Sequence, residues 1–237
     1  MQAVIFGASG GIGRALTLQL AARPDITRVH AASRSSAPSG PKIVPHIADI
    51  MNESDLAALA ATLKTEGQID LVLVATGLLS NDQNLKPEKS YRHQSLEAFE
   101  QVFRANTFGP ALVAKHVLPL MPRRGRAVFA ALSARVGSIS DNRLGGWHAY
   151  RASKAALNML VRNYAIEQAR VNNQFIAVTL HPGTVDTDLS QPFQSNVPDA
   201  QLFTPEQSAA YLLDVIENLT PADTGKCVDW AGKEVLA

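Results

Sequence analysis

A tyrosine and a lysine stand four residues apart in the chain, at Tyr150 and Lys154. On a helix this spacing places a phenol and an ammonium on one face, close enough to interact. The phenol alone is a poor acid–base group at neutral pH, because its ordinary pKa is about 10. A nearby ammonium favours the phenolate and so prepares the tyrosine to exchange a proton with a carbonyl oxygen. Taken singly, such a pair is more often a surface contact.

A glycine cluster near the start of the chain gives this pair its context. Residues 7–13 read Gly-Ala-Ser-Gly-Gly-Ile-Gly and follow an apolar strand predicted at residues 3–6. A turn of this kind at the start of a helix suits a pyrophosphate. Gly7 permits the sharp turn, Gly11 lets the backbone approach phosphate, and Gly13 allows close packing of helix on strand. The spacing differs from the commonest dinucleotide fingerprint, Gly-x-Gly-x-x-Gly, but its place between strand and helix indicates a nucleotide site.

Two further polar residues would complete a carbonyl-reducing site. Ser133 follows the strand predicted at residues 127–131 and could hold the substrate oxygen. Asn106 lies in a long helix predicted over residues 95–120 and could hold a water that links Lys154 to solvent. A serine after a strand is usually a turn residue, and an asparagine within a helix is often just polar surface. Together with the nucleotide turn, however, the set indicates a nicotinamide-dependent oxidoreductase.

The end of the second predicted strand indicates which cofactor binds. A site that prefers NAD has an acidic residue there for the ribose 2′-hydroxyl, whereas this chain has Ser33 and Arg34. A guanidinium suits a 2′-phosphate by charge and by its fork of donors. We therefore predict NADP(H) in preference to NAD(H), with Arg34 as the main selector; the alternative is a solvated loop arginine. Asp49, before Ile50, could position the adenine or could cap the helix that begins near Asn52.

The elements that must position these residues alternate between short β-type runs and longer helical stretches. The apolar runs at residues 71–75 and 127–131 are continuous, as in strands covered on both faces. We predict one α/β domain over residues 1–237, a Rossmann-type doubly wound parallel sheet of about seven strands flanked by helices. The predicted strands are residues 3–6, 29–33, 43–46, 71–75, 127–131, 176–180 and 227–229, and the predicted helices are 13–22, 53–63, 95–120, 149–171 and 205–218.

A proline-rich segment follows the sixth predicted strand. Residues 182–205 carry four prolines with Phe193 and Phe203. Ligands of open parallel sheets bind beyond the carboxyl ends of the strands, so this segment is a candidate substrate lid. A plain surface excursion is the alternative. The two phenylalanines weakly favour an apolar or aromatic substrate.

Composition excludes several other classes of protein. The 237 residues are 18% charged and 46% hydrophobic with a net charge of +1, which predicts no nucleic-acid or membrane partner. One cysteine, Cys227, and six scattered histidines predict neither a disulfide framework nor a metal site. No apolar run approaches the roughly 20 residues that span a bilayer, and no basic leader precedes the first strand. We therefore expect a cytoplasmic protein.

Nearly the whole chain resembles a short-chain dehydrogenase/reductase of the compact, single-domain type. The resemblance implies that Tyr150 is the catalytic acid/base, that Lys154 binds the nicotinamide ribose and lowers the tyrosine pKa, and that Ser133 orients the carbonyl. It also implies that Asn106 completes the proton relay. Residues 132–138 and 150–158 are further similar to the C-factor and Sniffer-like carbonyl reductases. The stretches that carry the resemblance are residues 7–13, Asp49, Asn106, Ser133, Tyr150-x-x-x-Lys154 and residues 181–187, His-Pro-Gly-Thr-Val-Asp-Thr.

The resemblance also implies how the cofactor is held. Val185 would contact the carboxamide and Thr187 the phosphates, and Gly77 would let the backbone pass the adenosine. The cofactor-binding residues predicted in all are Gly7, Ser9, Gly10, Gly11, Ile12, Gly13, Ser33, Arg34, Asp49, Ile50, Ala75, Thr76, Gly77, Asn106, Tyr150, Lys154, Pro182, Gly183, Val185 and Thr187.

The chain departs from the family pattern at two places. Residues 75–77 read Ala-Thr-Gly where the family usually has Asn-Ala-Gly, so one structural hydrogen bond is in doubt. The interval from Ser133 to Tyr150 is longer than usual, which makes Ser138 a rival for the serine role. We favour Ser133 because it directly follows the apolar strand and because Gly137 then falls where the family has its glycine.

The predicted function is reversible hydride transfer between NADP(H) and a carbonyl or alcohol substrate, as in a carbonyl reductase. The alternative is an NADP(H)-binding sensor or signalling protein with little turnover, but binding alone does not need a proton relay. An epimerase or dehydratase on nucleotide sugars is disfavoured, because little chain follows the sixth strand to build a substrate domain. The family resemblance implies a homodimer or homotetramer formed through the helix 149–171 and its neighbour.

Overall fold

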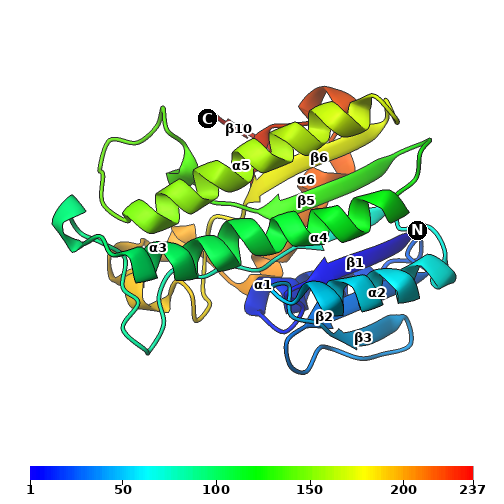
Figure 1. The fold of residues 1–237 in the computed structure, drawn as a ribbon, viewed down its shortest axis with the longest axis horizontal. Helices are drawn as coiled ribbons and strands as arrows, with labels where there is room; N and C mark the ends of the chain where they lie inside the picture. Colours follow the sequence, from blue (N-terminus) through cyan, green and yellow to red (C-terminus); the bar gives the residue numbers. More distant parts are fainter. Residues whose placement is uncertain (237) are drawn as a thin grey trace.

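The computed structural model describes residues 1–236, and these form an eight-stranded sheet with helices on both faces (Figure 1). The strand order is β10-β9-β6-β5-β4-β1-β2-β3, and every pairing is parallel except that of β10 with β9. The predicted doubly wound parallel sheet is confirmed. It has one strand more than the seven predicted, because the two residues of β10 are too few to show a strand-like alternation of apolar and polar residues. The strands of this sheet are β1 (Gln2–Phe6), β2 (Arg28–Ser33), β3 (Ile43–Ile47), β4 (Leu71–Val74), β5 (Ala127–Leu132), β6 (Phe175–His181), β9 (Cys227–Asp229) and β10 (Glu234–Val235).

The strand order reverses at β1, which pairs with β2 on one side and with β4 on the other. The chain therefore leaves the carboxyl ends of these strands in opposite directions. Such a reversal opens a crevice between the departing loops, which is where open α/β sheets bind their ligands.

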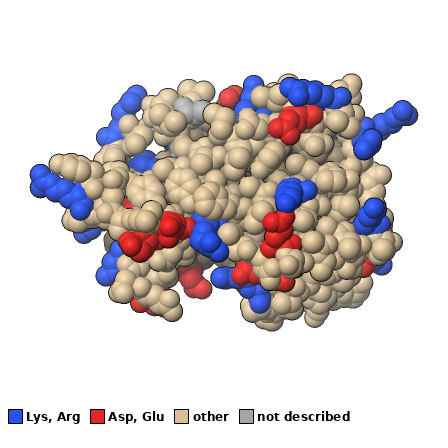
Figure 2. Space-filling view, in the orientation of Figure 1, with Lys and Arg blue, Asp and Glu red and all other residues tan. Residues whose placement is uncertain are grey.

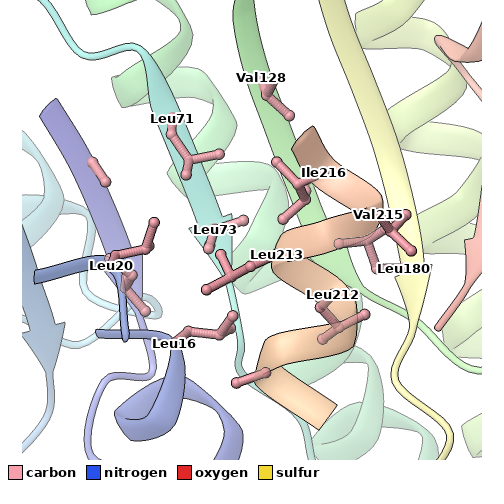
Figure 3. Close-up of a cluster of buried hydrophobic side chains, with 14 of the residues drawn as sticks. Leu16, Leu20, Leu71, Leu73, Val128, Leu180, Leu212, Leu213, Val215 and Ile216 are labelled. Atoms are coloured by element: carbon pink, nitrogen blue, oxygen red, sulfur yellow. The ribbon is translucent and has the colours of Figure 1, made fainter. Parts of the chain in front are cut away.

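Helices cover the two faces of the sheet around two separate apolar cores. Helices α1 (Gly11–Ala22) and α6 (Pro205–Asn218) pack on one face, where Figure 3 shows their leucines against strands β4 and β5. Helices α2 (Glu53–Glu66), α4 (Gly109–Val117) and α5 (His148–Ala169) pack on the other face. Successive strand residues point to opposite faces, so both cores draw on the same strands and the strand sequences are apolar throughout.

The helix predicted over residues 95–120 is not continuous. It divides into α3 (Leu96–Phe103), a π-helical turn (Arg104–Phe108), α4 and a short 3-10 turn (Leu118–Leu120). Pro110, at the start of α4, has no N–H to give to the carbonyl of Asn106 four residues earlier, so an α-helical ladder cannot run through this point. π-Helical turns of this kind often occur at functional sites.

The segment 182–205, predicted as a substrate lid or a surface excursion, contains secondary structure of its own. It contains two short strands, β7 (Thr184–Val185) and β8 (Leu202–Phe203), which pair in parallel and close its base. Thr204 and Gln207 then form a capping box that starts α6. The segment is thus a folded excursion attached at both ends, beside the carboxyl edge of the sheet.

Candidate active site

A cleft of about 430 Å³ lies at the carboxyl edge of the sheet, where the strand order reverses. Loops after five strands, β1, β2, β4, β5 and β6, and one face of α5 contribute to it. Many of the predicted residues meet here: Gly10, Gly11 and Ile12 of the glycine turn, Arg34 after β2, Ala75, Thr76 and Gly77 after β4, Ser133 after β5, Tyr150 and Lys154 on α5, and Pro182 and Thr187 after β6.

The glycine turn is held by backbone contacts that no side chain would allow. Gly7 has φ +85°, and a Cβ there would lie 2.9 Å from the carbonyl of Ala75. A Cβ on Gly13 would lie 2.1 Å from the oxygen of Gly7, so α1 packs tightly on the turn. Within the described chain, α1 begins with no side-chain cap and no acidic residue in its first turn. Its first N–H groups are therefore suited to an anion, and Gly11 faces Thr187 of the segment after β6.

Tyr150 and Lys154 lie in the first two turns of α5 and are both buried. Lys154 Nζ lies 5.7 Å from the centre of the tyrosine ring and donates a hydrogen bond of 2.8 Å to the carbonyl of Leu132. Burial raises the pKa of Tyr150 to about 12 and lowers the pKa of Lys154 to about 8. The lowered tyrosine pKa expected from the ammonium is not what the protein alone produces, because burial disfavours the charged phenolate. The phenol is therefore protonated at neutral pH.

Ser133 is fixed at the end of β5. Its backbone N–H donates to the carbonyl of Leu180 on β6, and its hydroxyl donates to Asn158 Oδ1 at 2.8 Å. Asn158 lies one turn beyond Lys154 on α5, a residue to which no role was given from the sequence although its eight-residue spacing from Tyr150 places it on the same helix face. The rival Ser138 is buried, accepts a hydrogen bond from the backbone of Asp141, and is not among the residues that line the cleft.

Asn106 uses its side chain to hold the loop after β4. Its Oδ1 accepts from the N–H of Leu78 at 2.7 Å, and its Nδ2 donates to the carbonyl of Leu78 and to Ser153 on α5. A Cβ on Gly77 would lie 3.7 Å from Asn106 Oδ1 and 3.8 Å from Lys154 Nζ, so both polar groups flank this glycine. Asn106 thus fastens the loop with the unusual Ala-Thr-Gly sequence to α5. A role in proton relay stays a prediction.

Several predicted cofactor residues lie outside the lining of the cleft. The hydroxyl of Ser33 donates to the carbonyl of Ser35. Asp49 accepts from the N–H of Met51, and Asn52 rather than Asp49 caps α2. The remaining predicted residues are Gly7, Ser9 and Gly13 within the glycine turn, Asn106 within the π-helical turn, Ile50, which packs on Gly109 of α4, and Gly183 and Val185, which line a second cavity.

This second cavity, of about 310 Å³, adjoins the cleft and shares Ser133 and Tyr150 with it. We call it the apolar chamber; its walls are Leu79, Val136, Trp147, Leu189, Phe193 and Val197, with His181 and Arg135 among the polar residues. The ring of Trp147 lies 5.1 Å from that of Phe193 and 6.2 Å from that of Tyr150, measured between centres. An aromatic wall therefore runs from the segment 182–205 to the phenol of Tyr150.

Glu88 is a further site residue that the sequence did not reveal. Its side chain is buried, and both carboxylate oxygens lie 3.3 Å from the N–H of Ala149 at the start of α5. Its carbonyl accepts from the N–H of Trp147, the residue before that helix. In the described chain no side chain of α5 itself caps this end, so Glu88 takes that role from 61 residues away. No local pattern encodes such a contact.

The chain matches the family model of the short chain dehydrogenases over residues 1–198. The chain belongs to the short-chain dehydrogenase family. A 1-hydroxy-2-glutathionyl-2-methyl-3-butene dehydrogenase from Rhodococcus sp. (strain AD45) is 30% identical over 226 residues, which are 94% of this chain and 93% of that protein. The C-signal protein of Myxococcus xanthus is 38% identical over 135 residues, 57% of this chain and 76% of that protein.

Solved structures of short-chain dehydrogenases have the same fold. An NADPH-bound carbonyl reductase from chicken fatty liver superimposes with a TM-score of 0.83 at 25% identity, covering 100% of this chain and 98% of that one. The carbonyl reductase Sniffer of D. melanogaster gives a TM-score of 0.86 at 22% identity, covering 100% and 99%. The predicted resemblance to the short-chain dehydrogenases is confirmed, and the chain is an oxidoreductase of this family. The match to C-signal supports the C-factor part of the predicted subgroup, and the likeness to Sniffer shows the shared fold.

Short-chain dehydrogenases bind a nicotinamide cofactor, and the cleft fits one. The Oγ1 of Thr76 is buried without a partner among the described residues, in a cleft that also presents the start of α1 and the Arg34 guanidinium. In the same described part, no group of three His, Cys, Asp or Glu is placed to hold a metal ion. No described helix is both long and apolar enough to cross a membrane.

Proposed function

We propose that this short-chain dehydrogenase is an NADP(H)-dependent carbonyl reductase. The observation that carries the proposal is the position of Tyr150 and Ser133, which lie at the junction of the nucleotide cleft and the apolar chamber. A carbonyl between these two side chains has its apolar substituents in the chamber and its carbon facing the cleft. The expected cytoplasmic location and homo-oligomeric state also stay proposals.

The residues of the chain divide the chemistry between them. When bound, NADPH supplies the hydride that attacks the carbonyl carbon. Ser133 holds the substrate oxygen, and Tyr150 gives it a proton as negative charge develops there, so that the product is an alcohol. Lys154 binds the nicotinamide ribose and stabilises the phenolate that remains. Asn106 and the π-helical turn hold the loop after β4 against this group.

The preference for NADP(H) rests on Arg34, which is exposed at the edge of the cleft beside Gly10 and Gly11. Replacing Arg34 by Asp puts a carboxylate where a 2′-phosphate would bind and offers an acceptor to a 2′-hydroxyl. We expect R34D to reverse the preference, with kcat/KM for NADPH falling about a hundredfold relative to that for NADH. Arg14, also exposed, is a matched control, since R14D tests a charge change on the neighbouring helix. An unchanged ratio in R34D contradicts the assignment.

The function itself is tested by NADPH consumption over a panel of aldehydes, ketones and quinones, with wild type and Tyr150→Phe compared. We expect turnover that Y150F reduces at least a hundredfold while NADPH binding, measured by fluorescence, is retained. If wild type binds NADPH and turns over no member of the panel, the NADP(H)-binding sensor becomes the better description.

A further inference from the structure

The apolar chamber contains a polar group with no use in the chemistry described so far. His181 is the last residue of β6 and lines the chamber beside Ser133, Trp147 and Tyr150. Its Nδ1 is buried, and no described residue supplies it with a hydrogen-bond partner. An unpartnered buried polar atom costs free energy, so this ring has hydrogen-bonding capacity beside the chamber that the described residues leave unused.

Three other polar side chains of the chamber, those of Arg135, Thr187 and Ser190, already have partners. Arg135 forms an ion pair with Asp141, Nε to Oδ2 2.7 Å, and points its charge to the exposed rim. The hydroxyls of Thr187 and Ser190 both donate to the carbonyl of Val185. The imidazole of His181, by contrast, makes no side-chain hydrogen bond to a described residue, and the residue is only partly buried where it lines the chamber.

Strand register places His181 next to the residue that holds the reacting oxygen. Leu132 of β5 pairs with Leu180 of β6, so the next residues, Ser133 and His181, lie side by side at the ends of the two strands. Neighbouring strands are about 4.8 Å apart, and paired residues share a face of the sheet. With the carbonyl oxygen at Ser133, a second oxygen on the adjacent carbon is directed towards His181.

We propose that His181 is a specificity residue that selects aryl ketones with a second oxygen on the carbon next to the reacting carbonyl, namely aryl 1,2-diketones and aryl α-hydroxyketones. The aryl group packs on the wall formed by Trp147 and Phe193. The second oxygen pairs with the imidazole. This inference rests on the proposed carbonyl reductase activity and adds the substrate class.

The protonation state of His181 suits both members of this class. Burial lowers its pKa to about 4, with Arg135 lowering it further and Asp229 on β9 opposing the shift. The imidazole is therefore neutral at physiological pH and offers one donor and one acceptor. It can donate to a second carbonyl or accept from a hydroxyl, and in neither case is a charge buried in an apolar chamber.

The test compares two probes that differ only in the second oxygen, 1-phenylpropane-1,2-dione and 1-phenylpropan-1-one. His181→Leu removes the polar group, and His181→Asn keeps a donor and an acceptor in a smaller side chain. His148→Leu is the matched control, because His148 Nδ1 is also buried and unpartnered in the described chain but His148 is not among the residues that line the chamber. Each variant is first checked for folding by thermal unfolding.

We expect H181L to lower kcat/KM for the dione about tenfold, the loss of one hydrogen bond of roughly 1.4 kcal/mol, and to change kcat/KM for the monoketone less than twofold. H181N should recover most of the lost selectivity, and H148L should leave the ratio of the two probes unchanged. Equal losses for both probes in H181L, or an unchanged ratio, would overturn the inference and leave His181 a structural residue.

A binding measurement separates this inference from the proposed function. Dissociation constants for the two probes are measured by tryptophan fluorescence with NADP⁺ bound, when no reduction occurs. If wild type oxidises NADPH with neither probe, the proposed reductase activity fails for this class, but a preference for the dione in binding that H181L abolishes still supports the role of His181. Equal affinities for the two probes in wild type overturn it.

Discussion

The hydroxyl of Ser133 has one proton, and in the structure it gives that proton to Asn158 Oδ1. A serine that is to donate to a substrate oxygen must have this proton free. A half-turn of the Asn158 amide exchanges its oxygen for its NH₂ group, which then donates to Ser133 and releases the serine proton towards the chamber. The orientation of the Asn158 amide therefore determines whether the Ser133 proton is free for a substrate, and Asn158 lies on the same helix as Tyr150 and Lys154.

The two candidate serines are distinguished by substitution. Ser133 lines both the cleft and the chamber, whereas the Ser138 hydroxyl accepts from the backbone of Asp141. We expect Ser133→Ala to lower kcat about a hundredfold, as when a donor to a developing oxyanion is removed, and Ser138→Ala to change stability by about 1 kcal/mol with kcat retained. Steady-state kinetics and urea unfolding measure the two effects. If only S138A loses turnover, the assignment of Ser133 is wrong.

The lowered pKa of Lys154, about 8, predicts how activity depends on pH. The ammonium is present below this pH and is lost as the pH rises through it, while Tyr150, with a pKa of about 12, keeps its proton over the same range. We expect kcat/KM for NADPH, which reports the free enzyme, to fall above about pH 8. The arginine in Lys154→Arg keeps its charge to higher pH, so the fall in kcat/KM should begin at a higher pH in this variant. If kcat/KM falls at the same pH in K154R as in wild type, the titrating group is not Lys154.

At the scale of elements, the start of α5 decides where Tyr150 lies, and Glu88 holds that start through the N–H of Ala149. We expect Glu88→Ala to reduce the free energy of unfolding by about 1–2 kcal/mol, the usual cost of losing a helix cap. It should also lower kcat, because the phenol is one residue from the capped N–H. Urea unfolding and steady-state kinetics are the measurements.

Glu97 provides the comparison for this variant. It is an exposed acidic residue in the first turn of α3, away from the cleft lining. Glu97→Ala should leave kcat unchanged and cost no more than a few tenths of a kcal/mol, as a screened helix-dipole charge does. If E88A and E97A change kcat and the free energy of unfolding equally, Glu88 acts only through its charge near a helix N-terminus and not by capping α5.

The contrast between α5 and its cap shows what the sequence could and could not predict. Apolar runs and turn residues placed the main strands within a few residues, and Tyr150 and Lys154 are marked by spacing within one helix. The contact of Glu88 with Ala149 joins residues 61 positions apart, so no local pattern carries it. The π-helical turn was missed because Asn106 still sits in an apolar, helix-like stretch; only the position of Pro110 indicates a break. Two-residue strands such as β10 show no periodicity at all.

At the scale of the whole molecule, α5 presents a face that its own sheet does not use. Leu157 and Val161 of α5 are buried against the sheet, and Tyr164 packs edge-on against Phe129. Met159 and Ile166, seven residues apart on the outer side of the same helix, are 63% and 46% exposed. Figure 2 shows this side of the molecule, where uncharged residues cover most of the surface between scattered charges.

The family resemblance predicts that this face joins subunits, and the structure makes the prediction specific. Two glutamates in place of Met159 and Ile166 would face each other across an interface built on α4 and α5, and each substitution would forgo about 1.5–3 kcal/mol of apolar burial. We expect wild type to elute as a dimer or tetramer and M159E/I166E as a folded monomer in size-exclusion chromatography with light scattering.

The control is Leu18→Glu. Leu18 lies on α1 at the opposite face of the sheet and is 40% exposed, so this variant should keep the wild-type mass. A monomeric wild type refutes the predicted assembly. If the double variant stays oligomeric, the subunits must associate through another surface. In either case Tyr150 and Lys154, which are buried within one subunit, would retain their positions.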